Sequence, residues 1–374
     1  MKKSVLLALL FVVMFNLSCA QDAENEVSVP ENTPFSAELL IDEIQTPWGM
    51  AFLPDGSMLV TEISGDLIHF KNGQKTMISN VPEVFRRGQG GLLDVALHPD
   101  YENTGWIYIS YASDKGDDKG GNTALMRAKL KENALVENEL LYKATPNTTK
   151  GQHFGSRIVF DNNGYLFLSI GERGDRDTNP QDLTRDGGKI YRFNADGSIP
   201  DDNPFVGKDG AKTAIYSYGH RNPQGLAKNP ETGEIWDNEH GPRGGDEINI
   251  VEPGANYGWP LVTYGINYSG TEITDKTEME GMTQPIHYWV PSIAPSGMAF
   301  VSSDTYGADW KGSVLVGSLK FQYLERLAMD GEKVTKREKL MADMGRVRDV
   351  KEGPDGLIYV AVEGKGIYKL VPKT

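Results

Sequence analysis

A histidine in a glycine-flanked loop is the first candidate for chemistry in this sequence. His153 lies in segment 151–157, immediately before an apolar stretch that we interpret as a strand. Imidazole titrates near neutral pH and is the side chain that most often serves as a general base. Glu172, at the end of the following pair of apolar stretches, could hold the ring and raise its basicity. The alternative for any single histidine is a hydrogen-bonded loop residue without a catalytic role.

A planar cation and an amide stand next to each other in a second loop. Arg221 and Asn222 precede a Pro-Gln-Gly turn within segment 219–226. A guanidinium presents a rigid fork of donors, and an amide adds one more donor and an acceptor. Together they would suit an oxyanion or a carbonyl ligand. The alternative is turn chemistry with an incidental surface arginine.

A third segment, 238–250, is rich in oxygen donors. Its Gly241-Pro242 pair exposes carbonyls, because the proline nitrogen cannot join a strand ladder, and Asp246 and Glu247 add anionic oxygens. Hard oxygen ligands favour Ca²⁺ over transition metals. The segment therefore predicts a calcium site, with a polar hairpin turn as the alternative.

Three further cations lie toward the C-terminus. Lys320 follows an apolar stretch, and Arg346 and Arg348 are spaced two apart, which puts them on one face of a strand. Arginine forks at this spacing suit a planar polycarboxylate. If that face were solvated, the two arginines would carry no function.

The elements that position these residues recur along the chain. Each repeat is a short apolar strand, a turn of Pro, Asp, Asn and Gly, and a second apolar strand. Such turns between apolar runs are strong hairpin signals. Six copies, spaced roughly 45 to 75 residues apart, predict an all-β, six-bladed β-propeller of four-stranded antiparallel blades over residues 37–374, with the site where loops converge at one mouth of the ring. The copies are 48–61, 93–110, 157–168, 224–236, 296–317 and 348–360.

Composition excludes several classes of protein. The 374 residues carry a net charge of −14, which argues against a nucleic-acid surface. The single cysteine, Cys19, excludes an intramolecular disulfide and any cysteine-cluster metal site. Gly88-Gln-Gly-Gly91 lacks the third glycine of a dinucleotide fingerprint and does not open a βαβ unit.

The first twenty residues are typical of a secretory signal peptide. A basic start is followed by an apolar run, 5–15, that is too short to span a bilayer. Two outcomes remain open: cleavage after Ala20, or lipid attachment at Cys19 as in a bacterial lipoprotein, which we favour. Residues 21–36 are polar and acidic, so we predict a flexible tether there. The expected location is the periplasm, soluble or anchored to the outer membrane.

Several segments together resemble one family, the soluble PQQ-dependent sugar dehydrogenases (glucose/sorbosone dehydrogenases), especially the bacterial aldose sugar dehydrogenases. PQQ is pyrroloquinoline quinone. The resemblance runs from about residue 46 to 371 and implies a six-bladed propeller that oxidises the anomeric C1 hydroxyl of aldoses to lactones. The segments that carry it are 46–50, 88–92, 153–157, 219–225, 238–249 and 346–349.

The resemblance also implies roles for single residues. His153 aligns with the general base that takes the proton of the anomeric hydroxyl while hydride passes from C1 to C5 of PQQ. Arg221 and Asn222 match residues that contact the quinone, and Arg221 is suited to stabilise the developing C5 oxyanion. The remaining cofactor-binding positions are Gln89, Lys320, Arg346 and Arg348.

Two calcium sites follow from the same resemblance. The carbonyls of Gly241 and Pro242 match ligands of a Ca²⁺ that polarises the quinone carbonyl. Glu247 and the Tyr257 carbonyl resemble ligands of a second, structural Ca²⁺. The chain departs from the glucose-specific members at Gln152, where those have an Asp, so the sugar is left open.

A different class of function is also compatible with a propeller. The alternative is a non-catalytic module that binds carbohydrate or protein at the cell envelope. Propeller lactonases use a calcium site built mainly of acidic and amide side chains, a pattern not evident in these segments. An external electron acceptor is required but unidentified, and the oligomeric state, monomer or homodimer, stays open.

Overall fold

The turns of the six repeats form hairpins between the first two strands of each sheet. In the first repeat Phe52 pairs with Met58 across the turn, and Ser57 N–H donates to Asp55 Oδ1 (3.0 Å). Gly56 has a φ of 81° with open space around it, so a side chain would fit but the backbone conformation favours glycine. Local turn chemistry thus sets the strand register.

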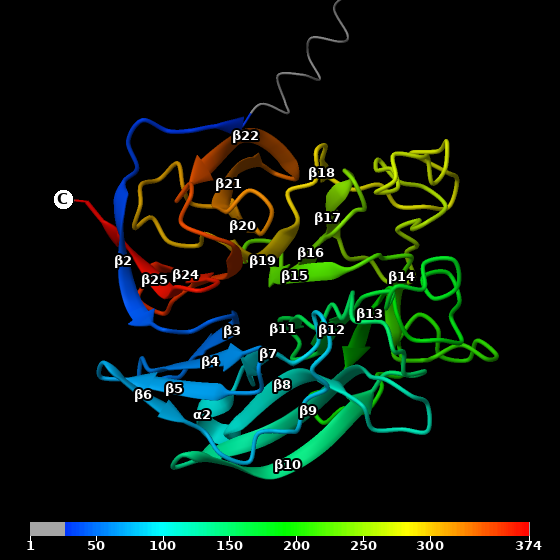
Figure 1. Ribbon diagram of the computed structural model, residues 1–374, viewed down its shortest axis with the longest axis horizontal. Helices are drawn as coiled ribbons and strands as arrows, with labels where there is room; N and C mark the ends of the chain where they lie inside the picture. The colour runs from blue at the N-terminus through cyan, green and yellow to red at the C-terminus, as the bar shows by residue number, and fades with distance from the viewer. Residues whose placement is uncertain (1–26, 374) are drawn as a thin grey trace, which may run out of the picture.

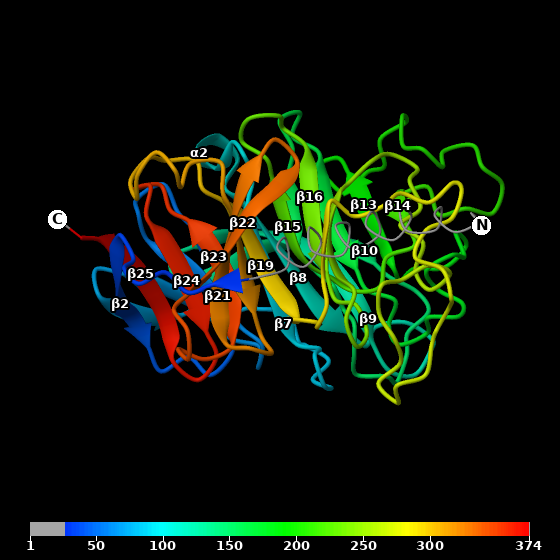
Figure 2. The ribbon, with the colours of Figure 1, turned by 90° about the horizontal axis from the view of Figure 1, so that it is seen from above.

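Six such sheets stand in a ring (Figure 1). The computed structural model describes residues 27–373, and within that range the sole helix is the single turn α2 (Tyr101–Thr104). Figure 2 shows strands such as β15, β16 and β23 running between the two faces of the disc. The predicted six-bladed β-propeller is confirmed.

In each of the first three blades, the four strands are neighbours in the order in which they occur along the chain. Blade 1 contains β3 (Pro47–Phe52), β4 (Met58–Glu62), β5 (Leu67–Lys71) and β6 (Gln74–Met77). Blade 2 contains β7 (Leu92–Leu97), β8 (Trp106–Ser113), β9 (Asn122–Lys131) and β10 (Ala134–Lys143). Blade 3 contains β11 (Ile158–Phe160), β12 (Leu166–Ile170), β13 (Lys189–Phe193) and β14 (Ile215–Tyr218).

The other three blades complete the ring. Blade 4 contains β15 (Pro223–Lys228), β16 (Ile235–Glu239), β17 (Asp246–Ile250) and β18 (His287–Trp289). Blade 5 contains β19 (Pro295–Phe300), β20 (Val314–Ser318), β21 (Tyr323–Asp330) and β22 (Lys333–Leu340). Blade 6 contains β23 (Val347–Glu352), β24 (Ile358–Val362), β25 (Gly366–Pro372) and the N-terminal β2 (Phe35–Asp42).

The two ends of the described chain close the ring together. β2 pairs antiparallel with β25, from Phe35 opposite Pro372 to Asp42 opposite Gly366, and the two strands lie side by side in Figure 1. This joint makes blade 6 depend on both ends of the propeller, which removes a free sheet edge.

The propeller begins earlier than the sequence predicted. β1 (Val27–Ser28) adds to β22 in parallel, and Phe35 is buried with its ring edge-on to Tyr306 and Trp310. The predicted boundary at residue 37 is therefore too late, because aromatic packing and strand pairing order the preceding residues. The predicted signal peptide, Cys19 and the first part of the tether lie outside the described residues. No helix in the described range is long and apolar enough to cross a membrane.

Apolar side chains on both faces of the blades hold the ring together. Each of six buried clusters joins two neighbouring blades; one packs Leu59 of blade 1 against Val95 of blade 2, and another packs Leu315 of blade 5 against Val350 of blade 6. Because every blade contacts two others, strands such as β12, β20 and β24 are buried along their whole length.

Candidate active site

A cavity of about 310 Å³ opens at one end of the inner strands. All six blades contribute to its wall, through residues at the starts of their inner strands or just after their second strands, so the loops converge at one mouth as predicted. The lining residues are Thr46, Trp48, Ile63, Arg86, Gly88, Gln89, Phe154, Gly155, Gln224, His240, Ala294, Leu319, Arg346, Arg348 and Glu363.

A buried arginine closes the middle of the ring below this cavity. Arg157 is 1% exposed, and its Nη1 lies 3.4 Å from Asp94 Oδ1 and 3.2 Å from Asp349 Oδ1. Its guanidinium stacks on the Trp48 ring at 4.1 Å, and Nη2 donates to the Arg348 carbonyl (2.9 Å). This ion network ties four blades together and fixes the backbone on which Arg348 stands.

The histidine singled out from the sequence is paired with a carboxylate. Nδ1 of His153 forms a short contact with Oε1 of Glu172, which is 2% exposed, while the His153 side chain is 13% exposed. Burial lowers the pKa of His153 below its usual value, Arg221 lowers it further, and the hydrogen bond to Glu172 opposes both. A carboxylate on Nδ1 leaves Nε2 free to accept a proton, which is the arrangement of a neutral general base.

The loop that carries His153 is held in place by a buried arginine, Arg173. The buried Arg173 guanidinium lies 3.4 Å from the centre of the Phe154 ring and donates to the carbonyls of Gly121 (3.3 Å) and Lys150 (3.2 Å). His153 itself has a φ of 57°, and its backbone N–H donates to Gln89 Oε1 (2.7 Å). The strained conformation is thus supported by the surrounding contacts.

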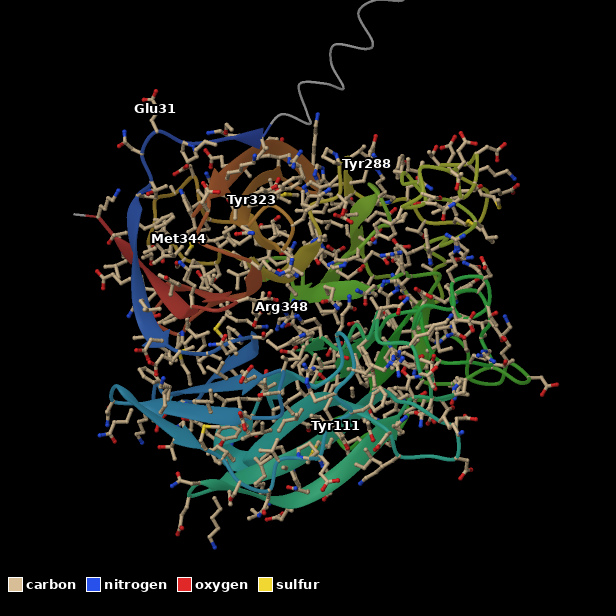
Figure 3. The ribbon with its side chains drawn as sticks, viewed as in Figure 1. Glu31, Tyr111, Tyr288, Tyr323, Met344 and Arg348 are labelled. Atoms are coloured by element: carbon tan, nitrogen blue, oxygen red, sulfur yellow. The ribbon has the colours of Figure 1, made fainter. Side chains whose placement is uncertain are left out.

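The predicted pair of arginines meets inside the cavity. Nε of Arg346 donates to Glu363 Oε2 (2.7 Å), and Nε of Arg348 donates to Glu363 Oε1 (3.0 Å). Figure 3 places Arg348 near the middle of the ring. The structure brings Gln89 to the same cavity. Lys320 differs: it is exposed, and its ammonium lies 4.9 Å from the centre of the Phe321 ring, although Leu319 before it lines the cavity.

Arg221 lines a second, very small cavity of about 10 Å³ next to the first, and Asn222 follows it in the chain. Glu239 Oε2 accepts from the backbone N–H of Arg221 (2.5 Å) and of Asn222 (3.2 Å), and Arg221 Nη1 donates to the His240 carbonyl (3.0 Å). His240 lines both cavities and joins them. Within residues 27–373, the buried Nδ2 of Asn222 has no hydrogen-bond partner, so a donor is available there.

The oxygen-rich segment is shaped by a buried aspartate. Asp246 Oδ1 accepts from Gly241 N–H (2.8 Å), and Oδ2 accepts from the backbone N–H of Ile293 (2.6 Å) and Ala294 (2.8 Å). Burial raises the pKa of Asp246 to about 6. A Cβ at Gly241 would lie 2.1 Å from the Gly245 carbonyl oxygen, so only glycine fits this turn.

The four residues predicted as calcium ligands lie close to one another. Gly241, Glu247 and Tyr257 line the small cavity, and Pro242 follows Gly241 in the chain. Among the described residues, the carbonyls of Gly241 and Pro242 accept no backbone or side-chain hydrogen bond. Burial and the charge of Glu239 raise the pKa of Glu247 well above its usual range.

Sequence reasoning missed three charged groups of this site. Glu363 forms ion pairs with both Arg346 and Arg348. The only sequence feature that could have indicated it is its position just after the second strand of the hairpin that follows the two arginines. Arg86 lies two residues before the segment 88–92 and also lines the main cavity. Glu239 lies inside the segment 238–250. Its role could not be inferred there, because it depends on the hydrogen bond that its carboxylate accepts from the backbone of Arg221 on the neighbouring strand connection.

Two solved structures that share this architecture are aldose sugar dehydrogenases. The apo form of the soluble aldose sugar dehydrogenase from Escherichia coli superposes with a TM-score of 0.87 at 43% identity, covering 91% of this chain and 100% of that one. The PQQ-bound form of aldose sugar dehydrogenase from Streptomyces coelicolor gives a TM-score of 0.74 at 28% identity, covering 92% and 100%. Fold and cavity thus define a propeller of the sugar dehydrogenase class.

The sequence comparisons agree. The aldose sugar dehydrogenase YliI of Escherichia coli (strain K12) is 45% identical over 336 residues, 88% of this chain and 90% of that protein. Quinoprotein glucose dehydrogenase B of Acinetobacter calcoaceticus is 29% identical over 416 residues, 89% and 86%. The family model described as Glucose / Sorbosone dehydrogenase matches residues 44–369, and the chain belongs to this family. It is an oxidoreductase, and the resemblance noted from the sequence is confirmed.

Proposed function

We propose that this protein oxidises the anomeric C1 hydroxyl of aldose sugars to lactones with PQQ and Ca²⁺ at the cavity described above. The observation that carries the proposal is that a carboxylate-held histidine, His153, lies beside the cavity whose wall carries Arg346 and Arg348. The backbone N–H of His153 donates to Gln89 of that wall, and the next residue, Phe154, also lines it. The names of the relatives support the substrate class and the cofactor.

The residues present fit a planar polycarboxylate quinone. The wall carries the guanidiniums of Arg86, Arg346 and Arg348, which pair well with carboxylates. The buried, unpartnered Nδ2 of Asn222 supplies a donor for a carbonyl oxygen. The carbonyls of Gly241 and Pro242 supply hard oxygens for a calcium ion.

The chain would hold the cofactor by charge and the metal by oxygen. Arg346 and Arg348 would bind carboxylates, with Gln89 and Lys320 at the rim. Gly241 and Pro242 would bind the calcium ion beside the quinone, and a second ion would be bound by Glu247 and the Tyr257 carbonyl. When bound, PQQ supplies a two-electron hydride acceptor, and Ca²⁺ supplies a Lewis acid.

A side chain of the protein would remove the proton of the sugar hydroxyl. His153 would accept it at Nε2 while Glu172 keeps the ring oriented through Nδ1 and stabilises the imidazolium that forms. Arg221, which lies close enough to lower the pKa of His153, would stabilise negative charge developing nearby.

Reconstitution tests this function. Protein purified without cofactor should reduce an artificial dye with aldose only after both PQQ and Ca²⁺ are added. Activity with NAD⁺ alone, or full activity after prior removal of calcium by a chelator and addition of PQQ without Ca²⁺, would contradict the proposal. Sugar binding without any dye reduction in the fully loaded protein would favour the non-catalytic carbohydrate-binding module.

A further inference from the structure

Blade 4 carries a group of buried polar side chains on the face behind the Arg221–Asn222 turn. In the β16–β17 ladder, Asp237 pairs with Asn249 and Glu239 pairs with Glu247. Residues two apart on a strand share a face, so all four side chains lie on the same side of the sheet. Asp237, Glu239 and Asn249 are at most 4% exposed.

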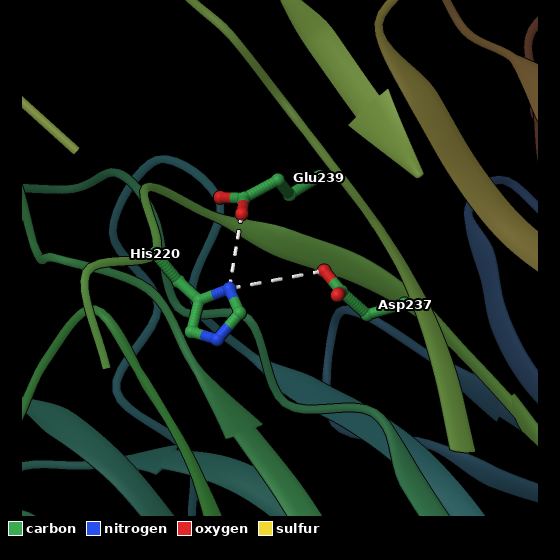
Figure 4. A group of neighbouring side chains, drawn as sticks. All are labelled: His220, Asp237 and Glu239. Atoms are coloured by element: carbon green, nitrogen blue, oxygen red, sulfur yellow. Dashed lines mark hydrogen bonds and ion pairs between the residues drawn. The ribbon is translucent and has the colours of Figure 1, made fainter. Parts of the chain in front are cut away.

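A histidine from the neighbouring blade completes this group. His220 follows β14 and is fully buried; its Nδ1 lies 3.0 Å from Glu239 Oε1 and 4.0 Å from Asp237 Oδ2 (Figure 4). These three ligand atoms lie within 4.8 Å of one another. The other ring nitrogen, Nε2, is 2.8 Å from Ser217 Oγ, and the ring stacks on Tyr257 at 4.4 Å. The imidazole is therefore fixed in place from both sides.

Unpartnered oxygens point to a missing positive partner in this group. Within the described residues, neither carboxylate oxygen of Asp237 has a hydrogen-bond partner, and neither has the amide oxygen of Asn249. The Asn249 amide lies against the group, since its Nδ2 donates to Glu239 Oε1 (3.4 Å). Buried anions of this kind require a proton or a cation.

We propose that His220 Nδ1, Asp237 and Glu239 bind a divalent cation of the zinc class, with the amide oxygen of Asn249 as fourth ligand. One imidazole and two carboxylates form a mixed nitrogen and oxygen set, which suits a first-row metal better than Ca²⁺. Ser217 would accept from Nε2–H and so leave the Nδ1 lone pair for the metal, as outer partners of metal-bound histidines do. The site differs in donor chemistry from the all-oxygen calcium sites proposed above.

Such a cation would act on the cofactor pocket through one carboxylate. Glu239 uses Oε1 toward His220 and Oε2 toward the backbone N–H groups of Arg221 and Asn222. A metal that fixes this carboxylate would therefore fix the turn that presents Arg221. This consequence rests on the proposed function, whereas the metal site itself does not.

Zinc titration of the full chain tests the site. The protein is stripped with a chelator, returned to excess Ca²⁺ to fill oxygen sites, and titrated with Zn²⁺ by calorimetry, with the thermal midpoint measured in parallel. We expect one Zn²⁺ per chain and a raised midpoint. Asp237→Asn should abolish stoichiometric binding, and Ser217→Ala should weaken it about 10- to 100-fold. Glu231→Gln, in an exposed turn of blade 4, is the matched control and should bind like the wild type.

Several outcomes of the zinc titration would refute the proposed metal site. If wild type and Asp237→Asn bind zinc equally, or if neither binds it, the site is refuted and Asp237 is compensated by a proton. Zinc that millimolar Ca²⁺ displaces would refute the assigned class of cation. Because Ser217→Ala removes no ligand, it decides the question even if Asp237→Asn fails to fold. A protein that binds zinc at this site but shows no PQQ-dependent activity would refute only the proposed function.

Discussion

The Glu363 carboxylate accepts a hydrogen bond of 3.0 Å from Nε of Arg348 at the wall of the main cavity. The same carboxylate accepts from Nε of Arg346 (2.7 Å), so one anion of the chain occupies both guanidiniums that we assign to the cofactor. Burial lowers the pKa of Arg348 while the charge of Glu363 opposes this effect, and burial tends to raise the pKa of Glu363 while the two arginines bring it below its usual value. Binding of a polycarboxylate must therefore compete with Glu363.

Removing this competitor should tighten cofactor binding. Glu363→Gln keeps the size of the side chain but withdraws its charge, so a carboxylate of PQQ meets two unpaired guanidiniums. We expect the Kd for PQQ to fall about tenfold, the scale of one charge-assisted hydrogen bond, and the thermal midpoint of the cofactor-free protein to fall as well. Absorbance titration and thermal unfolding measure both, with the exposed Glu332→Gln as control. Weaker binding in Glu363→Gln would show that Glu363 orders the arginines for the cofactor.

Arg348 should contribute more than Arg346 to the affinity for PQQ. The Arg348 side chain is 12% exposed and that of Arg346 is 46% exposed, and charges interact more strongly where water is excluded. Arg348→Ala should raise the Kd for PQQ roughly 10- to 100-fold, and Arg346→Ala should raise it less. At saturating PQQ, kcat should change little in either variant. A lower kcat with unchanged PQQ binding would instead assign Arg348 to the chemical step.

The acid limb of the pH profile should report on His153. A general base must be neutral, so activity is lost as the pH falls through its pKa, and burial places that pKa below the usual 6.5. Glu172 raises the pKa of His153, so Glu172→Gln should shift the acid limb of kcat to still lower pH and reduce the plateau. The exposed Glu102→Gln should leave the profile unchanged. A shift of the limb toward higher pH would contradict the assigned pairing.

Local signals explain why the propeller could be predicted from the sequence. Each blade contains one hairpin whose turn residues and apolar strands lie within a short stretch, as in residues 48–61. The closing strand β2 could not be predicted, because six of its eight residues are exposed and its partner β25 lies at the far end of the chain.

The same distinction applies to the candidate site. Segments with unusual residues, such as 151–157 and 219–226, allowed His153 and Arg221 to be proposed directly from the sequence. Glu363 escaped notice because its contact with Arg346 depends on the pairing of β23 with β24. Lys320 was grouped with the arginines by charge, but spacing along the chain says nothing about the direction of a flexible side chain, which here lies over Phe321.

The most direct test of the account is the rate at which aldose reduces bound PQQ in a single turnover, followed by PQQ absorbance without any external acceptor. His153→Ala should lower this rate about 10²- to 10⁴-fold, the usual contribution of a general base, while the Kd for PQQ changes little. His98→Ala is the control, since His98 packs against Tyr108 and Phe160 on another part of the ring, and it should react at the wild-type rate. A near-wild-type rate in His153→Ala at saturating PQQ, Ca²⁺ and sugar would contradict the account and would move the base to Glu172 or His240.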